Sequence, residues 1–71
     1  MRKNAVLGRI LQKKIRKYRK EARLTQEELA DKVGISRTYM GYIEQGRSVP
    51  SLEVLEKIAR VLKVKPSELI P

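Results

Sequence analysis

Seventy-one residues are enough for a single domain, and a chain of this size buries only ~60% of its unfolded surface. The chain has neither cysteine nor histidine, which excludes disulfides, thiolate nucleophiles, the usual zinc ligands and the usual general base at neutral pH. We therefore expect no enzyme, no metal site and no cofactor.

The basic residues are concentrated at one end of the chain. Residues 1–24 hold ten lysines and arginines and a single acid, Glu21, whereas residues 25–71 hold seven of each sign. The first segment therefore carries the whole formal net charge of +9. Such an excess predicts a polyanionic partner, either nucleic acid or an anionic membrane surface. The alternative is a highly charged, solvated helix of the kind that thermophile proteins carry.

Residues 1–5 are expected to form a flexible N-terminal arm, and residues 6–22 the first helix. Its apolar residues are spaced by four, four, three and four positions, which is helical periodicity: Leu7, Leu11, Ile15, Tyr18 and Ala22. A basic amphipathic helix can lie on a membrane, but so small a domain needs this stripe for its core. Because no apolar run resembles a signal peptide or a membrane span, we expect a cytoplasmic protein without a membrane partner.

A second helix is predicted to begin after Thr25. This threonine is a suitable N-cap, and Glu28, three residues later, completes a capping box. The apolar positions Leu29, Ala30 and Val33 share one face of the helix. Gly34 follows where a left-handed C-cap residue belongs, so we expect the helix to end there.

A third helix is predicted after Ser36, which can cap it. Met40 and Ile43 are three positions apart and give this helix one apolar face. If the apolar faces of the second and third helices pack on a common core, the outer face of the third stays free. That outer face consists of Arg37, Thr38, Gly41, Tyr42 and Gln45.

The remaining residues predict a turn and two further helices. Residues 47–50 form the turn, and Ser51 can cap a fourth helix. The apolar face of that helix is expected to comprise Leu52, Leu55, Ile58, Ala59 and Leu62. A short fifth helix follows Lys65. No segment alternates with period two, so the predicted fold is all-α, a compact five-helix domain over residues 6–71.

The spacing across the second and third helices is more specific than either helix alone. Counted from Gln26, the fifth position is the small Ala30 and the ninth is Gly34. Positions four, eight, ten, fifteen and eighteen are all apolar: Leu29, Val33, Ile35, Met40 and Ile43. This is the pattern of two helices that cross near a right angle and present the second one outward, as in helix-turn-helix DNA binding.

The segment TQEELADKVGISRTYMGYIEQGRSVPSLEVLEKIARVLKVKPSEL resembles the Cro and phage-repressor family of helix-turn-helix DNA-binding domains. Within it, SRTYMGYIEQGRSVPSLEVLEKIA is most similar to the small controller proteins of restriction–modification systems and to related stand-alone regulators. The resemblance implies a lambda-repressor-like five-helix fold. It also implies a homodimer that binds palindromic operators in double-stranded DNA, such as a repressor of transcription, without a small-molecule substrate.

The same resemblance implies roles for single residues. Arg37, Thr38 and Tyr42 match the base-contacting positions of the family. Tyr42 departs from the usual glutamine, lysine, asparagine or small residue, so stacking or a phosphate contact competes with base readout there. Six residues match positions that contact the DNA backbone: Gln26, Ser36, Tyr39, Arg19, Arg47 and Ser48. Packing of Tyr39 over the first and third helices is an equally good interpretation. The glycine at position 41 fits either a close approach to DNA or tight packing against the second helix.

Glu44 lies in the last turn of the third helix, where the helix dipole disfavours a carboxylate. Arg19 matches a family arginine that pairs with such a glutamate and also reaches a phosphate. We therefore predict an Arg19–Glu44 pair that docks the third helix on the first. The dimer surface is expected on the fourth and fifth helices, at Val54, Val61, Leu69 and Ile70.

Two alternative functions remain open from the sequence. The first is an antitoxin that binds both its operator and a toxin, although no segment after Pro71 offers a toxin-binding tail. The second is a non-enzymatic interaction module whose basic first helix binds RNA and whose scaffold binds protein, since fold alone does not guarantee function. The chain could also be one domain of a longer protein.

Overall fold

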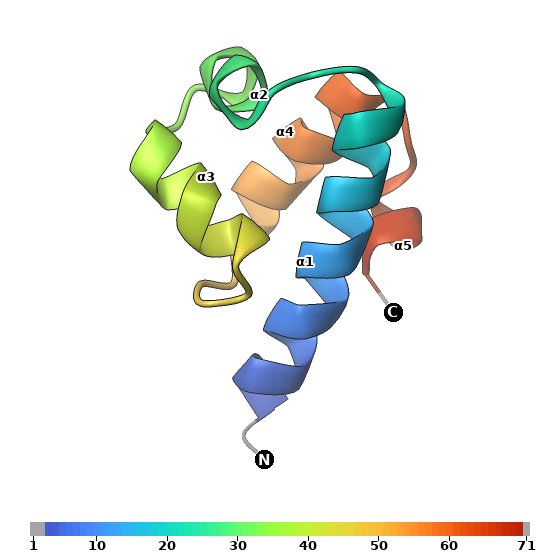
Figure 1. The fold of residues 1–71 in the computed structure, drawn as a ribbon. Helices are drawn as coiled ribbons and strands as arrows, with labels where there is room; N and C mark the ends of the chain where they lie inside the picture. The colour runs from blue at the N-terminus through green and yellow to red at the C-terminus, as the bar shows by residue number, and fades with distance from the viewer. Residues whose placement is uncertain (1–2, 71) are drawn as a thin grey trace.

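The computed structural model describes residues 3–70, and this part of the chain folds into five helices without a strand (Figure 1). The helices are α1 (Lys3–Glu21), α2 (Gln26–Val33), α3 (Arg37–Glu44), α4 (Leu52–Leu62) and α5 (Pro66–Leu69). The predicted all-α, five-helix, lambda-repressor-like architecture is confirmed. Within residues 3–70, none of the helices is both long enough and apolar enough to cross a membrane.

The long helix α1 is the support on which the other helices are arranged. It packs against α3, α4 and α5, and α2 packs against α3 and α4. In Figure 1, α3 lies on one side of α1 and α5 on the other, while α2 crosses the upper end of α3. Within residues 3–70, no other helix covers the outer side of α3 in this arrangement.

The start of α1 differs from the sequence prediction. The helix begins at Lys3, so residues 3–5 of the predicted arm continue the helix backbone instead of forming a loop. Residues 1 and 2 of that arm lie outside the described residues. Lysine and arginine are good helix formers, so nothing in the local sequence prevents the helix from beginning at Lys3.

The core is aliphatic, as the composition requires. Its buried apolar side chains come from all five helices: Leu11, Ile15, Leu29, Ala30, Val33, Met40, Ile43, Leu55, Ile58, Ala59, Leu62 and Leu69. The sequence predicts Leu52 on the apolar face of α4, but this side chain is 63% exposed. Leu52 is the first residue of α4 and lies on the predicted face, one turn before Leu55. At this end of the helix, none of the other elements within residues 3–70 covers it.

Three hydroxyl caps fix where α2, α3 and α4 begin. Thr25 Oγ1 accepts from the Glu28 N–H at 3.0 Å, and Glu28 Oε1 accepts from the Thr25 N–H at 2.9 Å, so the predicted capping box is present. Hydrogen bonding to the Glu28 carboxylate, first from the Thr25 backbone N–H and then from the Thr25 hydroxyl, holds the pKa of Glu28 below its ordinary value. Ser36 and Ser51 cap α3 and α4 in the same way, at 3.0 and 3.2 Å.

The turn between α2 and α3 is built on Gly34. This residue has φ of 85°, in the left-handed region, and its N–H donates to Ala30 O at 2.8 Å. A side chain at this φ would be strained, so glycine is the residue that lets the chain reverse here. The cap at Ser36 then starts α3 immediately, which places its outer face toward solvent.

Candidate nucleic-acid interface

The outer face of α3 is the most exposed part of the predicted site. Met40 and Ile43 are fully buried, so Arg37, Thr38 and Tyr42 on the opposite side are exposed. The Arg37 side chain is 72% exposed, and its contact with Glu27 on α2 is loose, at 3.9 Å between Nη1 and Oε2. An exposed pair at this distance contributes little, so Arg37 is free to reorient toward a ligand.

Tyr42 and Arg47, predicted separately from the sequence, are brought together by the structure. The Arg47 guanidinium lies 4.7 Å from the centroid of the Tyr42 ring, a cation–π contact. The backbone N–H groups of Arg47 and Ser48 both donate to Tyr42 O, at 2.9 and 3.3 Å. The turn after α3 therefore folds back on the residue that carries the aromatic ring.

The predicted Arg19–Glu44 pair is present and is more buried than an ordinary surface pair. Arg19 Nε donates to Glu44 Oε2 at 2.7 Å and Nη2 donates to Oε1 at 2.9 Å, which is a bidentate geometry. Glu44 is only 2% exposed, and the Arg19 side chain 12%. Arg19 Nη1 also donates to Leu24 O at 2.8 Å. The pair thus joins α1 to the last turn of α3.

Gln26 extends this pair to the second helix. Its Nε2 donates to Glu44 Oε1 at 3.3 Å, so residues from α1, α2 and α3 meet at one carboxylate. Among the described residues, every buried side-chain nitrogen or oxygen has a hydrogen-bond partner. The network fixes α3 relative to the N-terminus of α2, where exposed backbone N–H groups favour an anion.

The structure removes one of the two explanations for Gly41. A Cβ built at this position would meet nothing closer than Gln26 Oε1 at 4.0 Å, which is ordinary van der Waals distance. Tight packing against α2 therefore does not require glycine here. Close approach of a ligand to the outer face of α3 remains as the explanation, and it stays a prediction. Tyr39, in contrast, is half-buried against the core, so its packing role is present.

The residues predicted for a dimer contact separate into two groups. Leu69 is fully buried within its own chain, so the prediction for this residue is wrong: its side chain is already used in the core. Val54, Val61 and Ile70 are half-buried and remain candidates. Leu52 and Val49 were not predicted for the dimer contact, yet they are among the most exposed large apolar residues. Periodicity alone places Leu52 on a core face and could not reveal its exposure.

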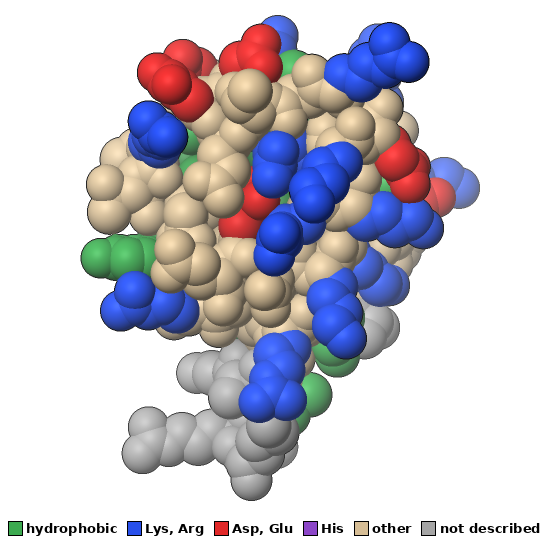
Figure 2. Space-filling view, viewed as in Figure 1, with side chains coloured by type: hydrophobic (Ala, Val, Ile, Leu, Met, Phe, Trp, Pro, Cys, Tyr) green, Lys and Arg blue, Asp and Glu red, His purple; other side chains and the backbone are tan. Residues whose placement is uncertain are grey.

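The charges follow the division seen in the sequence. Figure 2 shows lysine and arginine side chains along α1, beside α3, and acidic side chains over α2. The acidic group includes Glu27 and Glu28 in the first turn of α2, where negative charge is favoured by the helix dipole. The basic side chains of α1 thus lie next to the exposed helix, which itself carries Arg37.

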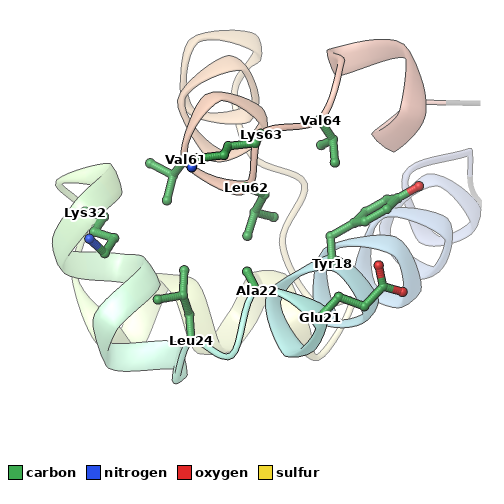
Figure 3. Close-up of a pocket in the computed structure, with 9 residues that line it drawn as sticks. All are labelled: Tyr18, Glu21, Ala22, Leu24, Lys32, Val61, Leu62, Lys63 and Val64. Carbon is green, nitrogen blue, oxygen red and sulfur yellow. The ribbon is translucent and has the colours of Figure 1, made fainter.

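A shallow groove of about 690 Å³ lies between the ends of α1 and α4 and the last turn of α2 (Figure 3). Its lining is mainly aliphatic, with lysines at its edge: Tyr18, Glu21, Ala22, Leu24, Lys32, Val61, Leu62, Lys63 and Val64. Of the residues predicted for a site, only Val61 lines it. The groove is therefore separate from the outer face of α3.

Comparison with known proteins identifies similar chains. A family model described as "Helix-turn-helix" matches residues 15–69. An uncharacterized HTH-type transcriptional regulator of Methanothermobacter thermautotrophicus is 52% identical over 48 residues, covering 68% of this chain and 70% of that protein. The immunity repressor protein of Bacillus phage phi105 is 42% identical over 57 residues. That match covers 80% of this chain but only 40% of the phage protein.

The fold is also similar to that of a solved regulator. The restriction-modification controller protein C.AhdI from Aeromonas hydrophila superimposes with a TM-score of 0.81 and 34% sequence identity. The match covers 86% of this chain and 92% of the controller. Both chains therefore share the arrangement of helices that exposes α3.

Proposed function

Because the chain belongs to the helix-turn-helix family of Cro and phage-repressor type, we propose that it is a transcriptional regulator that binds palindromic operator DNA as a homodimer. The observation that carries this proposal is the exposed outer face of α3, on a helix that is fixed by a buried ion pair. Within residues 3–70, the side-chain contacts of this face include the loose one between Arg37 and Glu27 and the cation–π contact between Tyr42 and Arg47. An α-helix of this kind fits the major groove of B-DNA. The protein would act in the cytoplasm.

Sequence recognition is assigned to the outer face of α3. Arg37 has a guanidinium that is free to make two hydrogen bonds to O6 and N7 of guanine, an interaction worth about 1–3 kcal/mol of discrimination. Thr38, next along the helix, can place its methyl group against a thymine. Tyr42 has one side of its ring near Arg47, which favours a contact with the sugar–phosphate backbone or a stacking contact over hydrogen-bonded base readout.

Backbone contacts are assigned to both ends of α3. Gln26 lies at the N-terminus of α2 and Ser36 at that of α3, and Arg47 and Ser48 lie in the turn after α3. Arg19 and Tyr39 complete the set of six. Contacts of this type position the protein without reading the sequence. They would fix the angle at which α3 enters the groove.

The dimer contact is assigned to half-buried and exposed apolar side chains on α4 and on the segments next to it. The half-buried ones are Val54, Val61 and Ile70, and the exposed ones are Leu52 and Val49. Two copies with recognition helices one DNA turn apart, ~34 Å, would read the two halves of a palindrome. The similarity to a restriction-modification controller protein supports the proposal that this chain is a compact regulator.

The test is selection of bound DNA from a random pool, followed by measurement of Kd for the selected site at several salt concentrations. We expect a palindromic site, and a Kd that rises by ~0.9 log unit per log unit of salt for each phosphate neutralised. Arg37→Ala should raise Kd about tenfold for the selected site and relax specificity at one position. Arg60→Ala, an exposed arginine on α4, is the control for loss of one positive charge.

One outcome would favour the interaction module instead. If Arg37→Ala left binding intact while neutralising Lys13, Lys14 and Lys17 abolished it, the basic helix and not α3 would be the binding element. A salt dependence near zero would count against any nucleic-acid partner.

A further inference from the structure

A glycine inside α1 lies directly against the backbone of the turn after α3. Gly8 is buried, and a Cβ built on it would lie 2.7 Å from the carbonyl oxygen of Gly46 and 3.5 Å from its carbonyl carbon. Real Cβ atoms do not approach an oxygen so closely, and a backbone carbonyl cannot rotate away as a side chain can. Only glycine therefore lets α1 lie at this distance.

The contact is also close from the side of the turn. Gly46 has φ of 75°, and a Cβ built on it would lie 3.1 Å from Gln12 Oε1 and 3.5 Å from Gly8 O. Two glycines thus face each other, with the Gln12 side chain closing the contact one turn along α1. Glycine is unfavourable inside a helix, so its presence at position 8 calls for a packing reason, and this contact supplies one.

What the contact supports is the turn that carries predicted DNA-backbone contacts. Arg47 follows Gly46 directly, and its guanidinium lies over the ring of Tyr42. The N–H groups of Arg47 and Ser48 donate to Tyr42 O, so the turn is attached to α3 on one side and rests on α1 on the other. A shift of Gly46 would therefore be passed on to Arg47.

We propose that Gly8 is a positioning residue for DNA binding, which sets the place of the Gly46–Ser48 turn and so of the Arg47 guanidinium relative to α3. This inference rests on the proposed function. Gly8 lies in α1, outside residues 15–69, the span that matches the helix-turn-helix family model. An alanine here would move the turn by roughly half an ångström or more to reach ordinary contact distance.

The experiment compares four proteins on the DNA site selected by the unaltered chain: the unaltered chain, Gly8→Ala, Arg47→Ala and the double variant. We expect Gly8→Ala to stay folded by far-UV circular dichroism and to raise Kd by about tenfold or more, the effect of removing a charge-assisted hydrogen bond. The slope of log Kd against log salt should fall by ~0.9 for each protomer of the homodimer, because each protomer neutralises one phosphate fewer. In the Arg47→Ala background, Gly8→Ala should change Kd less than about twofold, because the two act as one unit.

Val6→Ala, an uncharged change on the exposed side of the same helix, is the control and should leave Kd unchanged. A folded Gly8→Ala with unaltered Kd and salt slope would overturn the inference, as would equal losses in both backgrounds. If Gly8→Ala does not fold, Gln12→Ala loosens the same contact without adding atoms, and an unchanged Kd for that variant would overturn the inference instead. Failure of the unaltered chain to select any DNA would overturn the proposed function itself.

Discussion

Glu44→Ala is the substitution whose effect the structure predicts most directly. It removes the carboxylate that accepts from Arg19 at 2.7 and 2.9 Å and from Gln26 at 3.3 Å. The Arg19 side chain is only 12% exposed, and among the described residues its guanidinium would keep Leu24 O as its remaining hydrogen-bond partner. Breaking a buried pair by removing one partner costs about 3–5 kcal/mol, because the other charge stays buried without compensation.

That loss is large for a chain of 71 residues. At roughly 0.05–0.15 kcal/mol per residue, the free energy of unfolding is about 4–11 kcal/mol, so the variant would lose about a quarter of it or more. For a domain of this size, each kcal/mol shifts Tm by about 4–8 °C, so we expect a drop of at least ~12 °C. Thermal and urea unfolding followed by far-UV circular dichroism would measure it.

Glu53→Ala is the matched control. Glu53 pairs with Lys57 at 3.5 Å on α4, but its side chain is 79% exposed, so its loss should cost no more than about 1 kcal/mol. Replacing both partners of the buried pair, as Arg19→Met with Glu44→Leu, should recover part of the loss, since no charge is then left uncompensated. If Glu44→Ala is destabilised no more than Glu53→Ala, the reasoning from burial and bidentate geometry is refuted.

Three further predictions follow from single interactions. Gly41→Ala should raise stability by about 0.5–1 kcal/mol, because a Cβ fits there and alanine favours the helix, while weakening DNA binding because the DNA can no longer approach the helix as closely. Since the folded pKa of Glu28 is depressed, its contribution is present above the ordinary glutamate pKa of about 4.3 and is lost as the pH falls through the lower folded value. Tm should therefore fall more steeply below that pH for the unaltered chain than for Glu28→Gln, which keeps the cap without titrating. Leu52→Ser should shift the chain toward monomer in sedimentation equilibrium without loss of helicity, because its side chain is exposed.

For each of these three predictions, a specific result would contradict it. Gly41→Ala binding DNA as tightly as the unaltered chain would mean that no ligand approaches the helix there. Parallel pH profiles of the two proteins would mean that the Thr25–Glu28 capping box does not titrate. An unchanged dimer constant for Leu52→Ser would place the dimer contact elsewhere, with Val54 and Val61 as the next variants.

Local features of this protein could be predicted from the sequence because they depend on residues that are neighbours in the chain. Thr25, Ser36 and Ser51 cap their helices as their positions indicate, and Gly34 takes the left-handed conformation that ends α2. The apolar spacing predicted which faces of α2 and α3 are buried. The family resemblance added the Arg19–Glu44 pair, which joins residues 25 positions apart and which no local pattern reveals.

Other features depend on what lies across the fold, and only the tertiary structure decided them. Leu52 and Leu69 are both leucines in helices, yet one is exposed and the other buried, because burial depends on which elements reach each helix end. The sequence could not show that Glu44 is buried, which changes its expected contribution from about 0–1 kcal/mol to several. No sequence motif includes Gly8. Its role follows from a backbone distance to Gly46, and such distances are set by how helices pack and not by the order of residues.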